Sequence, residues 1–116
     1  MTHNTKSTRY YSSKQEKNIA KTLSGKQVSN SGATRFNKGD VCLDNWLIEA
    51  KTSIEPKKSF AIKQDWLDKN KEEAFAMHKS YSALAFQFGP GLPNYYVISE
   101  KLFKQLVDYL KEENNQ

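Results

Sequence analysis

Hydrophobic residues recur along the chain with helical spacing in some segments and in short, strand-like runs in others. The predicted elements are a helix from Ser12 or Ser13 to Ser24, strands at 26–29, 40–43 and 46–52, a helix at 60–77, strands at 82–88 and 94–98, and a helix after Ser99. This order, α-β-β-β-α-β-β-α, is typical of an α/β sandwich in which helices cover a central mixed sheet.

Several residues mark where these elements begin and end. Gly25 is expected to end the first helix, and Asp44 with Asn45 is expected to join two strands in a tight hairpin. Ser59 is a candidate cap for the second helix. The last helix is expected to bury four apolar residues in the core: Phe103, Leu106, Val107 and Leu110.

A chain of 116 residues is long enough for one compact domain. Residues 1–11 are polar and lack periodicity, so we expect a basic flexible arm followed by a single domain over residues 12–116. No apolar run approaches the ~20 residues of a membrane span, and the first residues lack the apolar stretch of a secretory signal. The single cysteine, Cys42, suits a reducing compartment, so these features predict a cytoplasmic protein without a membrane partner.

The charges are unevenly distributed. Residues 1–39 hold eight Lys and Arg against one acid, a net charge of +7, whereas residues 40–116 hold ten against twelve, a net charge of −2. Such an excess at one end is typical of proteins that bind a polyanion, most often DNA or RNA. A solvated basic tail is the alternative, and charge alone does not decide between the two.

The candidate chemistry lies in two neighbouring predicted strands. Asp40 opens the first, and Glu49 and Lys51 lie near the end of the second, where alternation directs both side chains to one face. The hairpin would bring Asp40 alongside them. Two carboxylates that converge on one point can hold a hard divalent cation, which polarises a phosphate and activates water, while a nearby ammonium stabilises developing charge. Phosphodiester hydrolysis requires these groups.

A surface salt bridge is the alternative interpretation of the Glu-x-Lys pair, because such pairs are common on exposed strands and contribute little there. The apolar run Trp46-Leu47-Ile48 favours a central strand, in which Glu49 and Lys51 would be partly buried. Burying charges costs several kcal/mol unless they are paired or bound to a metal. The cluster is therefore a candidate functional site.

Gly-Asp at 39–40 followed by Glu-Ala-Lys at 49–51 resembles the motif of the PD-(D/E)xK nucleases, although Lys38 or Gly39 stands where the motif opens with proline. The similarity to archaeal-type and phage Holliday junction resolvases covers roughly residues 12–75. Its other parts are a leading helix with an internal glutamate, a Ser-Gly-rich loop, and the sequence Lys63-Gln64-Asp65. The resemblance implies a restriction-endonuclease-like α/β fold and a metal-dependent DNA endonuclease.

By position, the resemblance implies that Asp40 and Glu49 are the main metal ligands, joined by the backbone carbonyl of Ala50. Lys51 would orient or activate the attacking water and stabilise negative charge. The expected ion is Mg²⁺, and Mn²⁺ is expected to substitute for it.

Glu16, in the first predicted helix, would be an outer ligand or a ligand of a second metal. The alternative is a capping box with Ser13, in which Glu16 serves only the helix end. Glu16 lies on the same stripe as Ile19 and Leu23, which should face the sheet, and this position favours the site.

The resemblance also indicates where DNA would be bound. Ser31 is similar to a resolvase loop serine that helps to position the scissile phosphate, although a plain turn residue would also suit this loop. The full set of candidate DNA contacts is Arg9, Lys14, Ser31, Arg35, Lys38, Lys63 and Gln64. For the basic members of this set, a solvated surface charge is the alternative.

The most specific prediction is a homodimeric Holliday junction resolvase that acts in DNA recombination and repair. A C2 dimer with two active sites would match the two symmetric cleavage points of a four-way junction. A duplex endonuclease or nickase of the same fold is the alternative among enzymes. A non-catalytic DNA-binding module and an interaction protein without a nucleic-acid partner are the alternatives from other classes.

Overall fold

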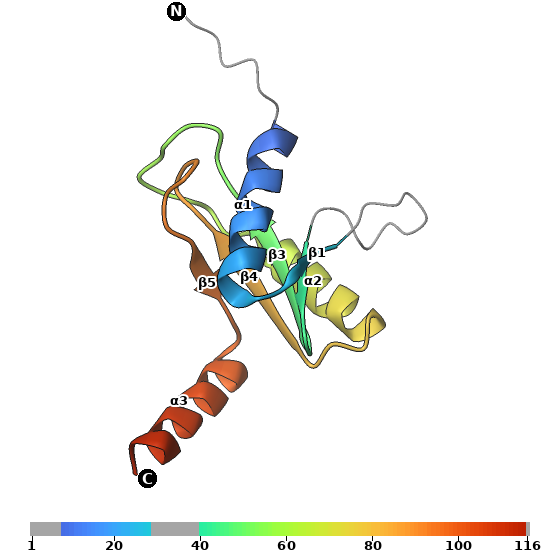
Figure 1. The fold of residues 1–116 in the computed structure, drawn as a ribbon, viewed down its shortest axis with the longest axis vertical. Helices are drawn as coiled ribbons and strands as arrows, with labels where there is room; N and C mark the ends of the chain where they lie inside the picture. The colour runs from blue at the N-terminus through green and yellow to red at the C-terminus, as the bar shows by residue number, and fades with distance from the viewer. Residues whose placement is uncertain (1–7, 29–39, 116) are drawn as a thin grey trace, which may run out of the picture.

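The structure is a computed structural model that describes residues 8–28 and 40–115. Its elements are α1 (Thr8–Leu23), β1 (Lys26–Gln27), β2 (Val41–Leu43), β3 (Trp46–Lys51), α2 (Gln64–Ala76), β4 (Tyr81–Phe86), β5 (Tyr95–Val97) and α3 (Glu100–Asn114). Figure 1 shows their arrangement, in which α3 projects from the rest of the protein. The predicted order of helices and strands is confirmed, and the chain has an α/β fold.

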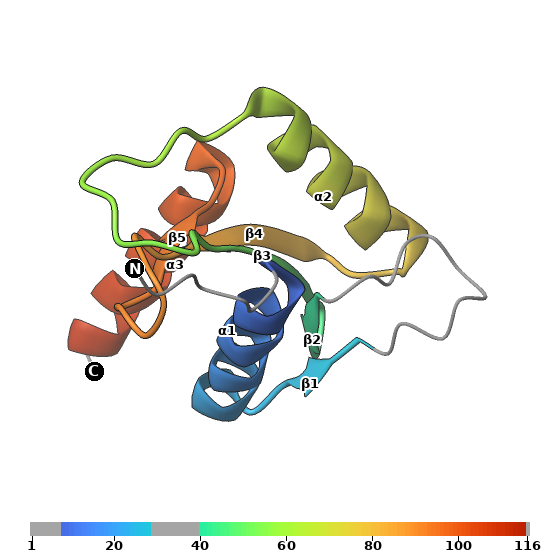
Figure 2. The ribbon, with the colours of Figure 1, turned by 90° about the horizontal axis from the view of Figure 1, so that it is seen from above.

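The strands form one mixed sheet in the order β1-β2-β3-β4-β5, so β3 lies at its centre. β3 and β4 are parallel, and α2 provides the crossover that a parallel pair requires. The other neighbouring pairs among the described strands are antiparallel. Figure 2 shows α1 against one face of the sheet and α2 against the opposite face.

The face of the sheet that α1 covers holds a hydrophobic core. Ile19 of α1 is buried there against Val41 of β2, Ile48 of β3, and Ala83 and Ala85 of β4. Because side chains alternate along a strand, the residues on either side of Ile48 point to the opposite face, toward α2. The core therefore determines which β3 side chains meet α2.

The predicted hairpin between β2 and β3 is confirmed. Leu43 pairs with Trp46, and the turn passes through Asp44 and Asn45. Asn45 has a φ of 64°, a left-handed conformation that asparagine tolerates better than most residues. This tight connection fixes the register between the two strands.

α1 begins at Thr8, earlier than the predicted start at Ser12 or Ser13. It therefore includes residues 8–11, which the sequence places in a flexible arm; the rest of that arm lies outside the described residues. Local contacts explain the earlier start, because the Nζ of Lys14 lies 5.7 Å from the centre of the Tyr10 ring one turn away. Such contacts at i,i+4 spacing stabilise a helix.

α1 ends close to the predicted position. Ser24 adopts a left-handed φ of 58°, and the N–H of Gly25 donates to the carbonyl of Ala20 at 2.8 Å. Gly25 has a second role, because a side chain there would collide with Leu43 and with the carbonyl of Cys42. Glycine thus allows the chain to pass close to β2.

α2 begins at Gln64, later than predicted, and the predicted cap at Ser59 is wrong. Lys63 occupies the cap position and makes no side-chain capping hydrogen bond. Packing holds the preceding segment out of the helix: the ring centroid of Phe60 lies 5.4 Å from that of Phe86 on β4 and 6.4 Å from that of Trp66. This aromatic contact overrides the helical spacing of the local sequence.

α3 begins after Ser99, whose Oγ accepts a hydrogen bond from the N–H of Leu102 at 3.1 Å. The prediction that this helix buries its apolar residues is wrong for most of them. Leu102 is buried and Val107 is half-buried, whereas Phe103 and Leu110 are each 59% exposed and Leu106 is 39% exposed. The helix projects from the sheet instead of lying across it (Figure 1). Among the described residues, no helix has the length and apolar character needed to cross a membrane.

Candidate active site

Glu49 and Lys51 lie on the face of β3 that points toward α2, as strand alternation predicts. The Nζ of Lys51 is 3.4 Å from Oε2 of Glu49. Glu49 is buried and Lys51 is half-buried on the central strand. This burial contradicts the alternative of a solvated surface salt bridge.

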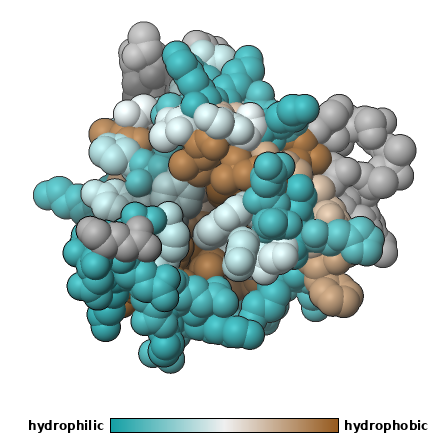
Figure 3. Space-filling view, turned by 60° about the horizontal axis from the view of Figure 1, so that its bottom comes forward, coloured by the Kyte–Doolittle hydropathy of each residue, from teal (hydrophilic) through white to brown (hydrophobic). Residues whose placement is uncertain are grey.

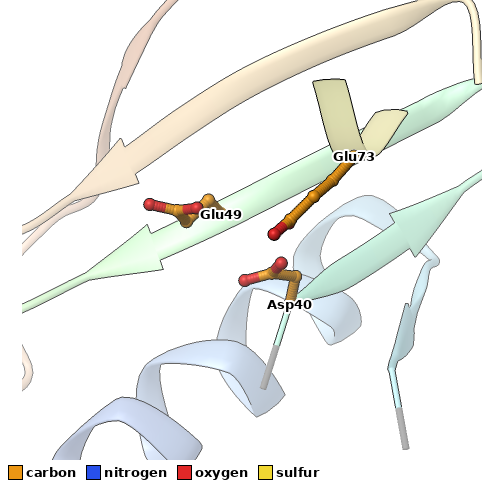
Figure 4. A group of neighbouring side chains, drawn as sticks. All are labelled: Asp40, Glu49 and Glu73. Carbon is orange, nitrogen blue, oxygen red and sulfur yellow. The ribbon is translucent and has the colours of Figure 1, made fainter. Parts of the chain in front are cut away.

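Asp40 lies immediately before β2 and is also buried. Its carbonyl accepts a hydrogen bond from the N–H of Val28 at 2.6 Å, which holds it beside the end of β1. One carboxylate oxygen from each of Asp40, Glu49 and Glu73 lies within 4.8 Å of the others. Figure 4 shows the Glu73 side chain reaching from α2 toward Asp40, with Glu49 on β3 beside them. The hairpin therefore brings Asp40 close to Glu49, as predicted.

Glu73 is a site residue that the sequence analysis missed. It directly follows Glu72, so residue type alone does not distinguish the two glutamates. Glu72 is exposed, whereas Glu73 is only 5% exposed. Helical spacing could have separated them, because Glu73 falls on the buried side of α2 with Asn70 and Ala74. Glu16 lies in the same way on the buried side of α1, with Ile19.

The three carboxylates form an electrostatically unfavourable group when no cation is present. Burial, and then the charges of Glu49, Glu73 and Glu16, raise the pKa of Asp40 from 3.8 to about 8, although Lys51 opposes this rise. Burial raises the pKa of Glu73 as well, and Lys69 opposes it. Two lysines lie beside the three carboxylates, Lys51 near Glu49 and Lys69 with its Nζ 4.0 Å from Oε1 of Glu73, and this leaves negative charge that a cation or a proton must balance.

A hard divalent cation fits this donor set. All three side chains offer oxygen atoms, which Mg²⁺ and Mn²⁺ prefer, and the three residues come from different parts of the fold. Burial excludes much of the water that would otherwise screen their charges. The geometry supports a metal site made of Asp40, Glu49 and Glu73, of which only Glu73 is absent from the ligands that the sequence predicts.

Glu16 lies outside this group of three. It is buried on α1, and its Oε1 accepts a hydrogen bond from Nε2 of Gln27 at 3.3 Å. Burial raises its pKa to about 7, while Gln27 and Arg9 oppose the rise. Because α1 begins at Thr8, Glu16 lies in the middle of the helix, so the alternative of a capping box is wrong. Its charge still raises the pKa of Asp40, so it lies within electrostatic reach of the cluster.

Lys51 is held by contacts that the sequence did not reveal. Its Nζ lies 4.6 Å from the centre of the Trp66 ring on α2, a cation–π distance. Its backbone carbonyl accepts hydrogen bonds from Nε2 of Gln15 at 2.8 Å and from the N–H of Gln87 at 3.2 Å. Helices on both faces of the sheet therefore help to fix the position of Lys51.

The candidate DNA contacts that the structure describes are exposed. Arg9 and Lys14 lie on α1, and Lys63 and Gln64 lie at the start of α2. The Nζ of Lys63 is 5.6 Å from the centre of the Trp66 ring, on which Lys51 also packs. Three further candidates, Ser31, Arg35 and Lys38, lie outside the described residues. The role of the Ala50 carbonyl stays a prediction.

No family model, no curated protein and no solved structure matches this chain. Its functional interpretation therefore depends on its own residues and their geometry.

Proposed function

We propose that the protein is a metal-dependent endonuclease that hydrolyses phosphodiester bonds in DNA. The observation that carries this proposal is the buried group of Asp40, Glu49 and Glu73, whose carboxylates lie within 4.8 Å of one another, with Lys51 Nζ 3.4 Å from Glu49. Buried acidic groups of this density need a counter-charge, and a phosphodiester substrate needs a cation and an ammonium at the same place.

Asp40, Glu49 and Glu73 would hold the ion, and Mg²⁺ bound there would neutralise phosphate charge and lower the pKa of water. Lys51 supplies an ammonium that stabilises negative charge on the phosphate as it develops. Trp66 and the carbonyl contacts of Lys51 limit the positions that this ammonium can take. Glu16, which is close enough to raise the pKa of Asp40, is proposed as an outer acidic residue.

The substrate that we propose is a four-way DNA junction. Support comes from the resemblance to the resolvases, from the α/β element order, and from the net charge of +7 over residues 1–39. Two copies, each with one site, would match the symmetry of the junction. We propose a restriction-endonuclease-like fold on the same grounds, and a cytoplasmic place of action because the single cysteine, Cys42, suits a reducing compartment.

Junction cleavage tests the proposal. A four-way junction and a duplex of equal length are incubated with the protein in Mg²⁺, in Mn²⁺ and in EDTA. Glu73→Gln is compared with Glu72→Gln, which makes the same change at an exposed neighbouring position. We expect cleavage with either metal, none in EDTA, and a loss of more than about 10²-fold in Glu73→Gln alone, because a metal ligand is removed.

The outcomes separate the alternatives. Equal cleavage of junction and duplex would favour a duplex endonuclease or nickase. Binding without cleavage in either metal would favour the non-catalytic module and would contradict the proposed function. Wild-type cleavage by Glu73→Gln would remove Glu73 from the site while leaving Asp40 and Glu49 as candidate ligands.

A further inference from the structure

The side of α3 that its apolar residues occupy is largely exposed. Helical spacing places Leu102, Phe103, Leu106, Tyr109 and Leu110 on this side, and of these five only Leu102 is buried. Tyr109 is 58% exposed and Leu110 is 59% exposed. A single exposed apolar residue needs no explanation, but a continuous row on a projecting helix indicates an interaction surface.

An apolar groove lies beside this row. It has a volume of about 250 Å³, and it is lined by residues from the end of α1, the β2–β3 hairpin, β5 and α3, among them Leu23, Trp46, Tyr96 and Leu106. Figure 3 shows hydrophobic surface gathered around a hollow on one face, with hydrophilic surface surrounding it. Because Leu106 belongs to both the row and the groove, the two form one continuous apolar surface, here called the α3 surface.

We propose that the α3 surface is a homodimer interface in which apolar side chains of α3 from each copy enter the groove of the other copy. This inference deepens the dimer that the proposed function includes, but it depends only on the fold. The surface is self-complementary, because one chain presents both a projecting apolar helix and an apolar groove that its own helix does not fill. A C2 pair uses each element twice and covers both.

The exposed apolar area is adequate for such an interface. Tyr96, Phe103 and Tyr109 are 41%, 59% and 58% exposed. Since a buried aromatic side chain covers roughly 150–250 Å², these three residues alone supply about 300 Å² per copy. Leu23, Leu106 and Leu110 add to this area, and a standard interface buries about 800 Å² per partner, of which roughly half is apolar.

The charges of α3 argue against a polyanion as its partner. Residues 100–114 hold three lysines and four acids, a net charge of −1, in contrast to the basic first third of the chain. DNA or an anionic lipid surface would gain little attraction from such a helix. A second copy offers an apolar surface without requiring opposite charge.

The proposed interface leaves the acidic site free. β5 is antiparallel to β4, so α3 leaves the sheet at the end where β3 and β4 begin, near Trp46. Glu49 and Lys51 lie toward the other end of β3. Assembly can therefore be disrupted without touching the proposed metal ligands.

Sedimentation equilibrium of the full chain, without metal or DNA, tests the interface over a micromolar concentration range. The variant Phe103→Glu with Leu110→Glu removes two exposed apolar side chains, and Tyr96→Glu changes the groove. The matched control combines Lys101→Gln with Gln105→Glu, two exposed positions on another side of α3 that together change the charge by the same two units as the α3 variant. Circular dichroism checks that each variant is folded.

We expect a wild-type dimer and a control that is equally dimeric. The α3 variant and the groove variant should each weaken association by about 30-fold or more, the effect of losing a central interface residue. A monomeric wild-type protein would overturn the proposal, and so would a dimer that resists both variants. A dimer weakened by the α3 variant but not by Tyr96→Glu would overturn the seating of α3 side chains in the groove. Because no cleavage is measured, these results are independent of the nuclease proposal.

Discussion

Both faces of the sheet hold buried apolar residues, such as Ile48 on the α1 face and Leu47 on the α2 face, but the α2 face also holds buried acids. On the α1 face, Ile19, Val41 and Ile48 form an apolar core whose burial favours folding. On the α2 face, at the end of β3, Glu49 lies with Asp40 and Glu73 in a buried acidic group. The first arrangement stabilises the metal-free protein, and the second opposes its stability. Burial of the apolar residues therefore offsets the free-energy cost of burying the acids.

The largest expected effect concerns the charged face. Lys51→Ala should lower the rate of cleavage by about 10³-fold, roughly 4 kcal/mol, because it removes the ammonium that stabilises charge in the transition state. Single-turnover kinetics on a four-way junction measure this rate, and DNA binding is measured separately. Lys71→Ala removes an exposed lysine from α2 and serves as the control. If Lys51→Ala and Lys71→Ala cleave equally fast, Lys51 has no catalytic role.

A smaller effect is expected on the apolar face. Ile19→Ala should lower the free energy of unfolding by about 3 kcal/mol, because the side chain is fully buried and its removal leaves a cavity. Urea unfolding in excess EDTA gives the value, with Asn18→Ala as an exposed neighbour on the same helix. A cost below about 1 kcal/mol would mean that the site collapses around the alanine and that this core is loosely packed.

The smallest effect concerns how the free energy of unfolding depends on pH, which reports the cost of the buried acids. Burial and the neighbouring carboxylates raise the pKa of Asp40 from 3.8 to about 8 in the folded protein. The folded state therefore holds this proton more tightly than the unfolded chain does. The proton on Asp40 therefore contributes fully to stability below the ordinary pKa of 3.8, and this contribution is lost as the pH rises toward about 8.

In excess EDTA, the free energy of unfolding should accordingly fall across this window. Near pH 8, Asp40→Asn should be more stable than the wild type by roughly 1–3 kcal/mol, and addition of Mn²⁺ should stabilise the wild type but not the variant. Asp44→Asn, at an exposed position in the hairpin turn, should match the wild type both in stability and in its response to Mn²⁺. If Asp40→Asn is less stable than the wild type at this pH, the acidic group does not destabilise the metal-free protein.

The sequence predicted the parts of the site that depend on local geometry. Strand alternation and one tight turn are sufficient to place Asp40, Glu49 and Lys51 together, since all three lie within one hairpin. Helical spacing could have assigned Glu73 to the buried side of α2, but its place beside Asp40 and Glu49 depends on how α2 packs across the sheet, which local spacing does not determine. The position of the Lys51 ammonium likewise depends on a long-range contact with the Trp66 ring.

The fold shows the same division. The element order follows from periodicity and turns, and it was predicted correctly. The burial of α3 was not, because an amphipathic pattern indicates that a helix has an apolar side but not what covers it. The late start of α2 had a similar cause: the ring of Phe60 packs on Phe86 of β4, a residue far away in sequence.

The parallel pairing of β3 with β4 has a consequence for the order in which the molecule assembles. The β2–β3 hairpin is local and can form early, whereas Glu73 reaches the other two carboxylates only after the α2 crossover has docked. The repulsion among the acids therefore develops late in folding, after most of the folding barrier has been crossed. A divalent ion bound to the acids should then stabilise the native state more than the transition state. It should slow unfolding in stopped-flow experiments far more than it accelerates folding.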